Sequence, residues 1–434
     1  MRIETQIKPE TTMNLSRRTA LKVLAAGSGQ IFMPSIVKAQ DSIRIGVLDV
    51  FSGPLAAFGP QVKQGISLYL DQRNKMLQGR PVELILYDTQ GQPNRAVDQA
   101  QRLVFENKVQ ILLGPATSAE ALAVNSFLAS KQIQVPIVGV SVAGDLTQRL
   151  LNPWLLRISS TASQATYPLA DFAAKELRYR TVAIVADDYL LGYEISGGFQ
   201  RVFEDAGGRI TQRVWVPLSE RDYTAALEQL GSRADAIFVG LSGARGLNFI
   251  QQARRSGVRL PMLANFSNMD ASFFDTAQRE FGEDLVGTIS SSWYFPDSEF
   301  SANQMFATSM RRELSSTPSL NAAAAYTFGA VLEQALQKLG GEIEDRRRFI
   351  ETLRGSEVLD TIRGPVKFDE RGNVVGIIFI ARASRTSRSN TALLGNEPIK
   401  KYPFVSQFWT YDPTTFLSSP AFSKEYPPAH YLER

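Results

Sequence analysis

The sequence predicts an α/β protein made of two similar halves, each with a central parallel sheet covered by helices. Three observations predict it. Short β-branched runs alternate with amphipathic stretches from residue 43 onward, and such alternation indicates parallel strands joined by helical crossovers. The same rhythm restarts after a polar stretch at 159–163. The chain has 434 residues, 44% of them hydrophobic, which is enough for two domains.

In the first half, the expected strands are short and rich in Ile, Leu and Val, as strands buried on both faces are. They are 43–48, 82–87, 109–113 and 136–140. Between them, apolar side chains recur three or four positions apart, which predicts helices with one buried face. These helices are 59–76, 93–106 and 118–130. We interpret the apolar residues of both sets as core.

The second half repeats the pattern before the chain changes character near residue 295. Its expected strands are 181–185, 213–217, 236–240 and 262–264, and its expected helices are 192–206, 223–230 and 246–256. An alanine-rich helix is predicted over 320–339, and 364–373 reads as a strand that enters a tight turn. Two further strands are expected at 374–381 and 405–411, followed by a loosely attached tail.

The N-terminus has the features of an export signal. Residues 16–22 resemble the twin-arginine pattern through Arg17 and Arg18, although Ala20 stands where phenylalanine is common. An apolar stretch at 23–36 precedes a small-residue cleavage site that ends at Ala39. We therefore predict a twin-arginine-type signal peptide over 1–39 and a periplasmic mature chain, with Met13 left open as an alternative start. Because the chain has no cysteine, no lipid anchor is expected.

The charge and the rare residues exclude several function classes. The formal charge of +4 lies entirely within residues 1–40, so the neutral remainder gives no support for a nucleic-acid partner. The absence of cysteine excludes thiolate catalysis, disulfides and Cys-ligated zinc. A single histidine, His430, makes serine–histidine triads and His-ligated metals poor candidates. No nucleotide-binding or hydrolase motif is present. We therefore predict no catalytic residue, no metal and no cofactor.

Five short segments resemble one known family in their order along the chain. They are IGV at 45–47, FSGPLAAFG at 51–59, LYDT at 86–89, LGPATS at 113–118 and RGPVKFD at 363–369. Together they resemble the solute-binding proteins of branched-chain amino acid ABC importers, of the Leu/Ile/Val-binding type, over about 43–412. The resemblance implies a type I periplasmic binding protein, in which two Rossmann-like lobes joined by a three-crossing hinge close on a small solute.

The resemblance also implies a domain division and partners. It assigns 42–160 plus 294–363 to an N-terminal lobe, 161–293 plus 364–415 to a C-terminal lobe, and 416–434 to a C-terminal tail. Hinge crossings are expected near 158–161, 290–296 and 361–366. The implied partners are a small-molecule ligand and the permease subunits of an ABC importer, and the protein is expected to be a monomer.

The segment around Ser118 is a candidate anion site. It ends a strand and opens a helix, and the free N–H groups of a helix N-terminus favour a carboxylate. From the sequence alone, the default interpretation of Ser118 is a plain N-cap, and only the family resemblance reverses that preference. The resemblance implies that Ala116, Thr117 and Ser118 bind the ligand carboxylate. It adds the turn after the next strand, where Val142 or Ala143 replaces a threonine of the family and Ser141 is the candidate substitute.

The opposite end of the expected site departs from the family. Counting along the family motifs places Phe266 where an acidic residue pairs with the ligand ammonium. The expected tyrosines fall on Leu191, in the same segment as Tyr189, and near Ser242; Phe58 is a further candidate. We therefore predict a small apolar or aromatic carboxylate rather than a branched-chain amino acid.

Three alternatives stay open from the sequence. A ligand ammonium could still find a partner among three carboxylates, Asp187, Asp188 and Asp270. The protein would then bind a branched-chain amino acid, or an amide. The same fold also serves as the ligand-sensing domain of a membrane receptor.

Overall fold

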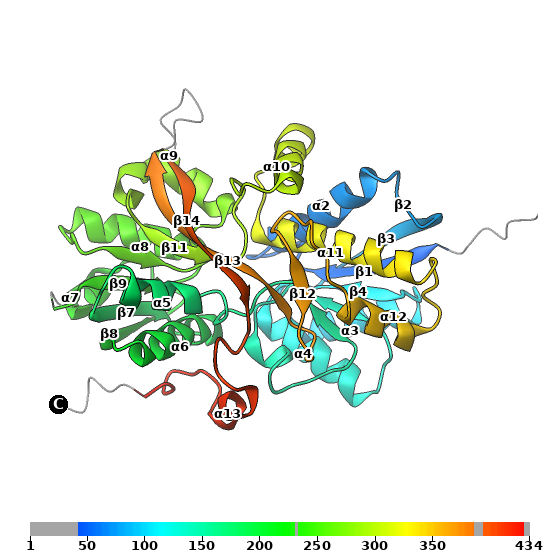
Figure 1. Ribbon diagram of the computed structural model, residues 1–434, viewed down its shortest axis with the longest axis horizontal. Helices are drawn as coiled ribbons and strands as arrows, with labels where there is room; N and C mark the ends of the chain where they lie inside the picture. Colours follow the sequence, from blue (N-terminus) through cyan, green and yellow to red (C-terminus); the bar gives the residue numbers. More distant parts are fainter. Residues whose placement is uncertain (1–41, 231–232, 386–393, 429–434) are drawn as a thin grey trace, which may run out of the picture. The chain divides into compact units, whose positions relative to one another are not determined.

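The computed structural model describes residues 42–230, 233–385 and 394–428 (Figure 1). Contacts divide the chain into a unit of residues 1–40 and a unit of residues 41–434, and only the second is described below. The predicted signal peptide, 1–39, lies outside the described residues. Among the residues that the structure describes, none of the helices combines the length and apolar character that a bilayer-spanning segment needs.

The first sheet has six strands in the described residues, in the order β2-β3-β1-β4-β5-β6. All neighbours pair in parallel except β2 with β3. The strands are β1 (Ile43–Asp49), β2 (Met76–Leu77), β3 (Arg80–Asp88), β4 (Ile111–Leu113), β5 (Ile137–Gly139) and β6 (Leu155–Arg157). The helices of this part are α2 (Phe58–Asp71), α3 (Pro93–Phe105), α4 (Ser118–Ser130), α10 (Ser301–Leu314), α11 (Leu320–Lys338) and α12 (Arg346–Arg354).

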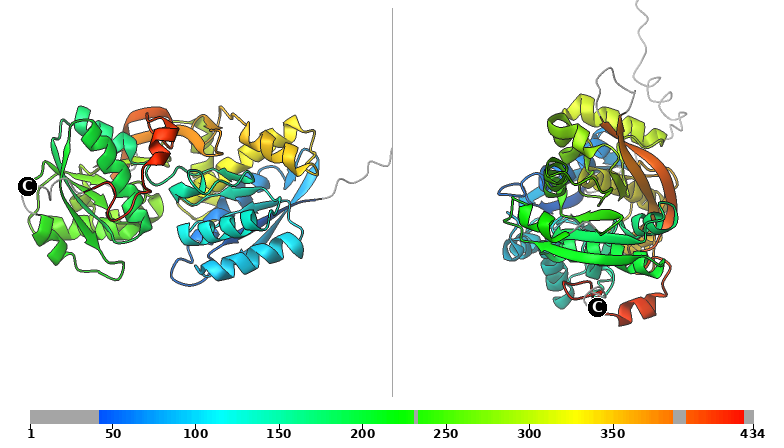
Figure 2. Two further views of the ribbon diagram at one scale, coloured as in Figure 1. Left: turned by 90° about the horizontal axis from the view of Figure 1, so that it is seen from below. Right: turned by 90° about the vertical axis from the view of Figure 1, so that its left-hand side faces the viewer.

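The second sheet runs β12-β13-β11-β10-β9-β7-β8, and β14 pairs with β13. The parallel strands are β7 (Thr181–Asp187), β8 (Arg209–Val216), β9 (Ala236–Gly240), β10 (Met262–Ala264) and β11 (Ile289–Ser292). The antiparallel additions are β12 (Val366–Phe368), β13 (Val374–Arg385) and β14 (Leu394–Val405). The helices are α5 (Tyr167–Lys175), α6 (Leu190–Asp205), α7 (Thr224–Leu230), α8 (Gly243–Arg255), α9 (Ala271–Leu285) and α13 (Pro413–Ser418). The predicted α/β class with two parallel-dominated sheets is confirmed, and Figure 2 shows each sheet with its helices.

The chain passes between the two sets of elements three times, after β6, after β11 and before β12. Arg363 lies in the third passage, is fully buried, and contacts residues of the other two passages. Its Nη1 donates to the carbonyl of Ile158 at 3.0 Å, and its guanidinium lies 4.4 Å from the ring centroid of Trp293. One side chain from the third passage therefore holds the first two together.

Two predicted elements are wrong in position. The helix expected over 59–76 ends at Asp71, because Asn74 and Lys75 take positive φ angles that a helix excludes, and the chain continues into β2. The strand expected over 405–411 is instead β14, which ends at Val405. Trp409, with a positive φ, lies in a turn beyond it.

The tail is also more firmly attached than predicted, as far as residue 428. Phe422 is buried, and it packs so closely on α6 that a Cβ on Gly197 would lie 2.4 Å from its ring. The carbonyl of Pro427 accepts a hydrogen bond from Arg213, and Lys424 forms an ion pair with Asp188. These contacts fix the tail to the helices and strands of the second sheet.

Candidate functional site

A cavity of about 430 Å³ lies where the loops that follow the parallel strands of both sheets meet. Ligands of open α/β sheets bind in this position, beyond the carboxyl ends of the strands. The lining residues are Leu55, Phe58, Gln61, Ala116, Thr117, Ser118, Val140, Val142, Ser159, Tyr189, Leu191, Leu218, Ser242, Phe266, Ser267, Asp270, Ser272, Phe273, Trp293, Leu320 and Asn321. Among the described residues, no lysine, arginine or histidine lines this cavity.

The structure brings nine of the eleven predicted site residues together in this wall. They are Phe58, Ala116, Thr117, Ser118, Val142, Tyr189, Leu191, Ser242 and Phe266. They lie in the connections that follow six strands, β1, β4, β5, β7, β9 and β10, either in the loop or in the first turn of the next helix. Motifs far apart in the sequence therefore converge, because each of these connections leaves its sheet at the edge formed by the carboxyl ends of the parallel strands.

Ser141 and Ala143 do not line the cavity, and the prediction that Ser141 replaces the family threonine is wrong in geometry. Ser141 is fully buried, and its Oγ accepts the N–H of Ala143 at 3.3 Å within the turn itself. Its carbonyl accepts hydrogen bonds from Arg157 and Ser159. Ala143 packs into an apolar cluster beneath the turn. Of the segment that follows β5, Val140 and Val142 line the cavity.

The N-terminus of α4 provides free donors at the cavity wall. Its N-cap, Thr117, has an extended conformation, and its side chain accepts no hydrogen bond from the helix. The first N–H groups of a helix have no partner within the helix, so those of residues 118–120 can bind an anion. Ser118, a buried residue with 8% of its surface exposed, lies at the same point and lines the cavity. The N–H of Ala116, by contrast, already donates to the carboxylate of Asp49.

Of the three carboxylates left open as ammonium partners, only Asp270 lines the cavity. Asp187 accepts from the N–H and hydroxyl of Ser242 and pairs with Arg245 at 2.9 Å. Asp188 accepts from Tyr193 and pairs with Lys424. The structure therefore excludes Asp187 and Asp188 from the cavity wall.

Asp270 is the N-cap of α9 and accepts the N–H and hydroxyl of Ser272. Its other oxygen accepts the N–H of Leu320, the first residue of α11, at 2.7 Å. Burial raises the pKa of Asp270, against these hydrogen bonds.

The sequence reading missed several lining residues, of which Trp293 is the largest. It follows β11 in the second passage between the sheets, is 2% exposed, and its indole Nε1 has no hydrogen-bond partner in the described structure. A ligand oxygen is the kind of group that would satisfy this donor. The signal that could have found Trp293 is its position directly after strand β11.

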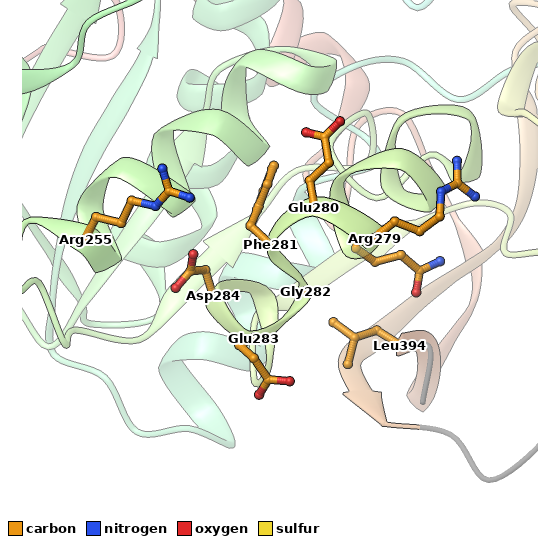
Figure 3. A pocket seen from close by; sticks show the side chains of 9 residues that line it. Arg255, Arg279, Glu280, Phe281, Gly282, Glu283, Asp284 and Leu394 are labelled. Atoms are coloured by element: carbon orange, nitrogen blue, oxygen red, sulfur yellow. The ribbon is translucent and has the colours of Figure 1, made fainter. Parts of the chain in front are cut away.

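A second cavity, of about 380 Å³, lies beside α9 and contains none of the predicted residues. Figure 3 shows Arg255 of α8 and several charged side chains of α9 around it, with Leu394 of β14 on one side. It adjoins the kink of α9 at Phe281, whose φ and ψ are −150° and 38°. Because acidic and basic side chains alternate around it, this cavity favours no ligand charge.

Comparisons with known proteins agree with this architecture. A family model described as periplasmic binding protein matches residues 42–388. The Leu/Ile/Val-binding protein BraC3 of Rhizobium johnstonii is 27% identical over 346 residues, which cover 79% of this chain and 91% of that protein.

Two solved structures are similar along most of the chain. The ABC transporter substrate-binding protein from Sphaerobacter thermophilus superimposes with a TM-score of 0.79 at 28% identity, covering 84% of this chain and 99% of that one. A solute-binding protein of an ABC transporter from Rhodopseudomonas palustris BisB5, solved with 3,4-dihydroxybenzoic acid, has a TM-score of 0.76 at 24% identity, covering 84% and 98%. At 24% identity, the similarity to this second structure shows that the two proteins share a fold.

Proposed function

Because the chain belongs to the periplasmic binding protein family, of the Leu/Ile/Val-binding type, we propose that it is the substrate-binding protein of an ABC importer. Its ligand is a small carboxylic acid with an apolar or aromatic body and no ammonium group. One observation carries the ligand class: the cavity joins the N-terminus of α4 to a largely apolar wall. The N-terminus of α4 suits the carboxylate of the ligand, and the apolar wall suits the rest of the ligand.

The wall supports an acid without an amine. Phe266, 4% exposed, lines the cavity where the resemblance implies an ammonium partner. Burying an ammonium against phenylalanine and leucine side chains without a paired anion costs several kcal/mol. The similarity to a protein solved with 3,4-dihydroxybenzoic acid supports the same class, although it rests on a shared fold.

The mechanism we propose is closure of two lobes on the ligand. We assign 42–160 plus 294–363 to one lobe and 161–293 plus 364–415 to the other, with the three passages between the sheets as the hinge. Closure surrounds the ligand with residues from both lobes, and the affinity then depends on the balance of open and closed forms. The signal peptide proposed for residues 1–39 would export the chain to the periplasm, where the mature protein delivers the ligand to permease subunits.

The first prediction tests the ligand class. Calorimetry should show tighter binding of 4-methyl-2-oxopentanoate or of benzoate-type acids, including 3,4-dihydroxybenzoate, than of leucine, since leucine must bury an ammonium group. A thermal-shift screen of the mature chain selects the acids to measure. If leucine binds at least as tightly as every acid, the second candidate function holds: an amino-acid receptor in which Asp270 pairs with the ammonium. Asp270→Asn would then weaken leucine binding selectively.

The second prediction concerns Ser118. Ser118→Ala should weaken binding of the acid by about 1–3 kcal/mol, because one charge-assisted hydrogen bond is lost while the backbone donors of α4 remain. The control is Ser130→Ala at the other end of the same helix, where the hydroxyl donates to the carbonyl of Phe127. Equal affinities of the two variants would show that Ser118 is only part of the helix start.

A further inference from the structure

The segment 144–149, which follows β5 and belongs to the first lobe assigned above, contacts the second lobe at its first residue. Gly144 donates its N–H to the carboxylate of Glu194 on α6 at 2.9 Å, and both residues are buried. Both elements also reach the ligand cavity close to this contact, the segment through Val142 and α6 through Leu191. The contact therefore joins the two lobes beside the cavity.

The C-terminal part of the chain binds the same segment. Arg149 donates through Nη2 to the carbonyl of Ser419 at 2.7 Å, and the hydroxyl of Thr147 donates to Gln407 at 2.8 Å. An ion pair with Asp145, at 2.9 Å, orients the guanidinium of Arg149. Because its donor is charged, the Arg149 hydrogen bond is among the stronger kinds in proteins. The chain beyond β14 is therefore attached to the first lobe.

Beyond Ser419, the chain continues over the second lobe and is attached there as well. Phe422 is buried against α6, in space that Gly197 leaves free because it has no Cβ. Lys424 forms an ion pair with Asp188 at 2.8 Å. One stretch of chain therefore holds both lobes, the first at Ser419 and the second from Phe422 onward.

The stretch between these attachments is packed rather than loose. Phe416 of α13 is 2% exposed, and its ring centroid lies 5.3 Å from that of Phe408 and 6.0 Å from that of Phe422. The guanidinium of Arg201, on α6, lies 4.7 Å from the ring centroid of Phe416. Because this packing holds the chain in one conformation, its two attachments cannot move apart independently.

We propose that residues 406–428 form a strap that fastens α6 to the segment 144–149 and favours the closed form of the two lobes. Since the segment and α6 belong to different lobes, opening must break the contact of Arg149 with Ser419 or detach the strap from α6.

The strap would set how firmly the ligand is retained. Among the described residues, those that line the cavity include none from the strap. It would therefore change the balance of open and closed forms, and the rate of ligand release, rather than the choice of ligand. This inference rests on the proposed function, since it requires two lobes that close on a ligand, and it deepens that function by naming what regulates closure.

The first test measures the distance between the lobes in the ligand-free protein. Because the chain has no cysteine, spin labels on Ala57→Cys and Ser219→Cys would report a single distance by pulsed electron paramagnetic resonance. Both positions are exposed, and each adjoins a cavity-lining residue of a different lobe, Phe58 and Leu218. The labels therefore flank the cavity without lining it, and opening should lengthen the distance between them.

Arg149→Ala, made in the labelled chain, removes the attachment of the strap to the first lobe. The ratio of open to closed molecules should rise about tenfold, because a hydrogen bond from a charged donor is lost. Arg346→Ala is the matched control, since this arginine also donates to a distant backbone carbonyl, that of Gln134 at 2.9 Å, but within the first lobe. The control should leave the distribution of distances unchanged.

Phe422→Ala removes the packing of the strap on the second lobe and should also favour the open form. A strap acts only when both ends are attached, so the double variant with Arg149→Ala should open the lobes no more than the stronger single variant. Additive effects would mean that each residue stabilises only its own lobe, which overturns the inference. Should either variant fail to fold, Lys424→Ala, whose side chain is 45% exposed, should shift the ratio in the same direction by about twofold.

Ligand release provides the second test and separates this inference from the proposed function. Stopped-flow measurements with benzoate and 4-methyl-2-oxopentanoate should show release from Arg149→Ala faster by a factor similar to the change in the open-to-closed ratio. Distances that neither Arg149→Ala nor Phe422→Ala changes would overturn the strap and leave the proposed function intact. If no acid binds the parent protein while both variants lengthen the distance, the proposed ligand class is wrong and the strap stands.

Discussion

Gly65→Ala is expected to lower the free energy of unfolding by about 3 kcal/mol. Gly65 lies on the buried face of α2, where α2 packs against α11. A Cβ at this position would lie 2.1 Å from the carbonyl oxygen of Ala322 and 2.8 Å from its carbonyl carbon. Because these are backbone atoms of a helix, no side-chain rotation relieves the clash, and the helices must move apart. Urea-induced unfolding followed by circular dichroism measures the change.

Gly282→Ala provides the matched control. Gly282 is also a helical glycine, in α9, but its Cβ would meet Leu394 at 3.5 Å, an ordinary van der Waals distance. Alanine is the better helix former by about 1 kcal/mol, so this variant should be as stable as the parent protein or slightly more so. If the two variants unfold at the same urea concentration, α2 and α11 do not require a glycine at their contact.

The elements that could be predicted from sequence are those whose own pattern decides their structure. β9 is a continuous apolar run, AIFVG, which is typical of a strand buried on both faces. The start of α4 is set locally by a Pro-Ala-Thr-Ser turn, and its predicted bounds agree with the structure. Such segments need no information from distant residues.

The elements that were missed depend on partners far along the chain. β11 reads ISSS, a polar sequence, yet all four residues are buried. The buried hydroxyl of Ser291 donates to the carbonyl of Ala165 at 2.6 Å, so its polar group is satisfied by a residue far along the chain. β14 contains two lysines and two prolines and becomes a strand only through pairing with β13. Neither hydrogen-bond partner can be seen in a local window.

The same distinction applies to the site. The sequence predicts which residues follow a strand, and residues in that position, such as Phe58, Thr117 and Phe266, line one cavity. The direction of a side chain within a turn could not, so Ser141 was assigned to the ligand while its hydroxyl accepts the N–H of Ala143. The burial of Asp49 and Glu120 was also hidden, because a carboxylate is usually exposed and only the packed loops remove water from both.

Thermal stability should be greater near pH 5 than near pH 8. The pKa values of two buried carboxyl groups, Asp49 and Glu194, are both raised to about 7, in each case mainly by burial. Glu194 of α6 accepts the N–H of Gly144 at 2.9 Å, but its other oxygen has no partner in the described structure. Both groups bind protons more tightly in the folded state than in the unfolded chain.

The sign follows from proton linkage. Between the ordinary carboxyl pKa of about 4 and the folded value of about 7, the folded state holds more protons, so the free energy of unfolding falls as pH rises. Since a tenfold change in proton affinity is worth about 1.4 kcal/mol, the two groups together account for a loss on the order of a few kcal/mol. Groups whose pKa is lowered, such as Asp88 and Asp235, act below that window, where acid protonates them and reduces stability.

Melting temperatures of the mature chain at constant ionic strength test this pH dependence. Asp49→Asn and Glu194→Gln should each flatten the decline between pH 5 and pH 8, since the amides cannot ionise, and the double variant should flatten it most. Asp88→Asn is the control: whatever its effect on stability, it should leave the slope in this window unchanged, because Asp88 is ionised throughout it. A melting temperature that is constant or rises toward pH 8 would mean that both buried groups find compensating charges, and that the fold does not hold their protons.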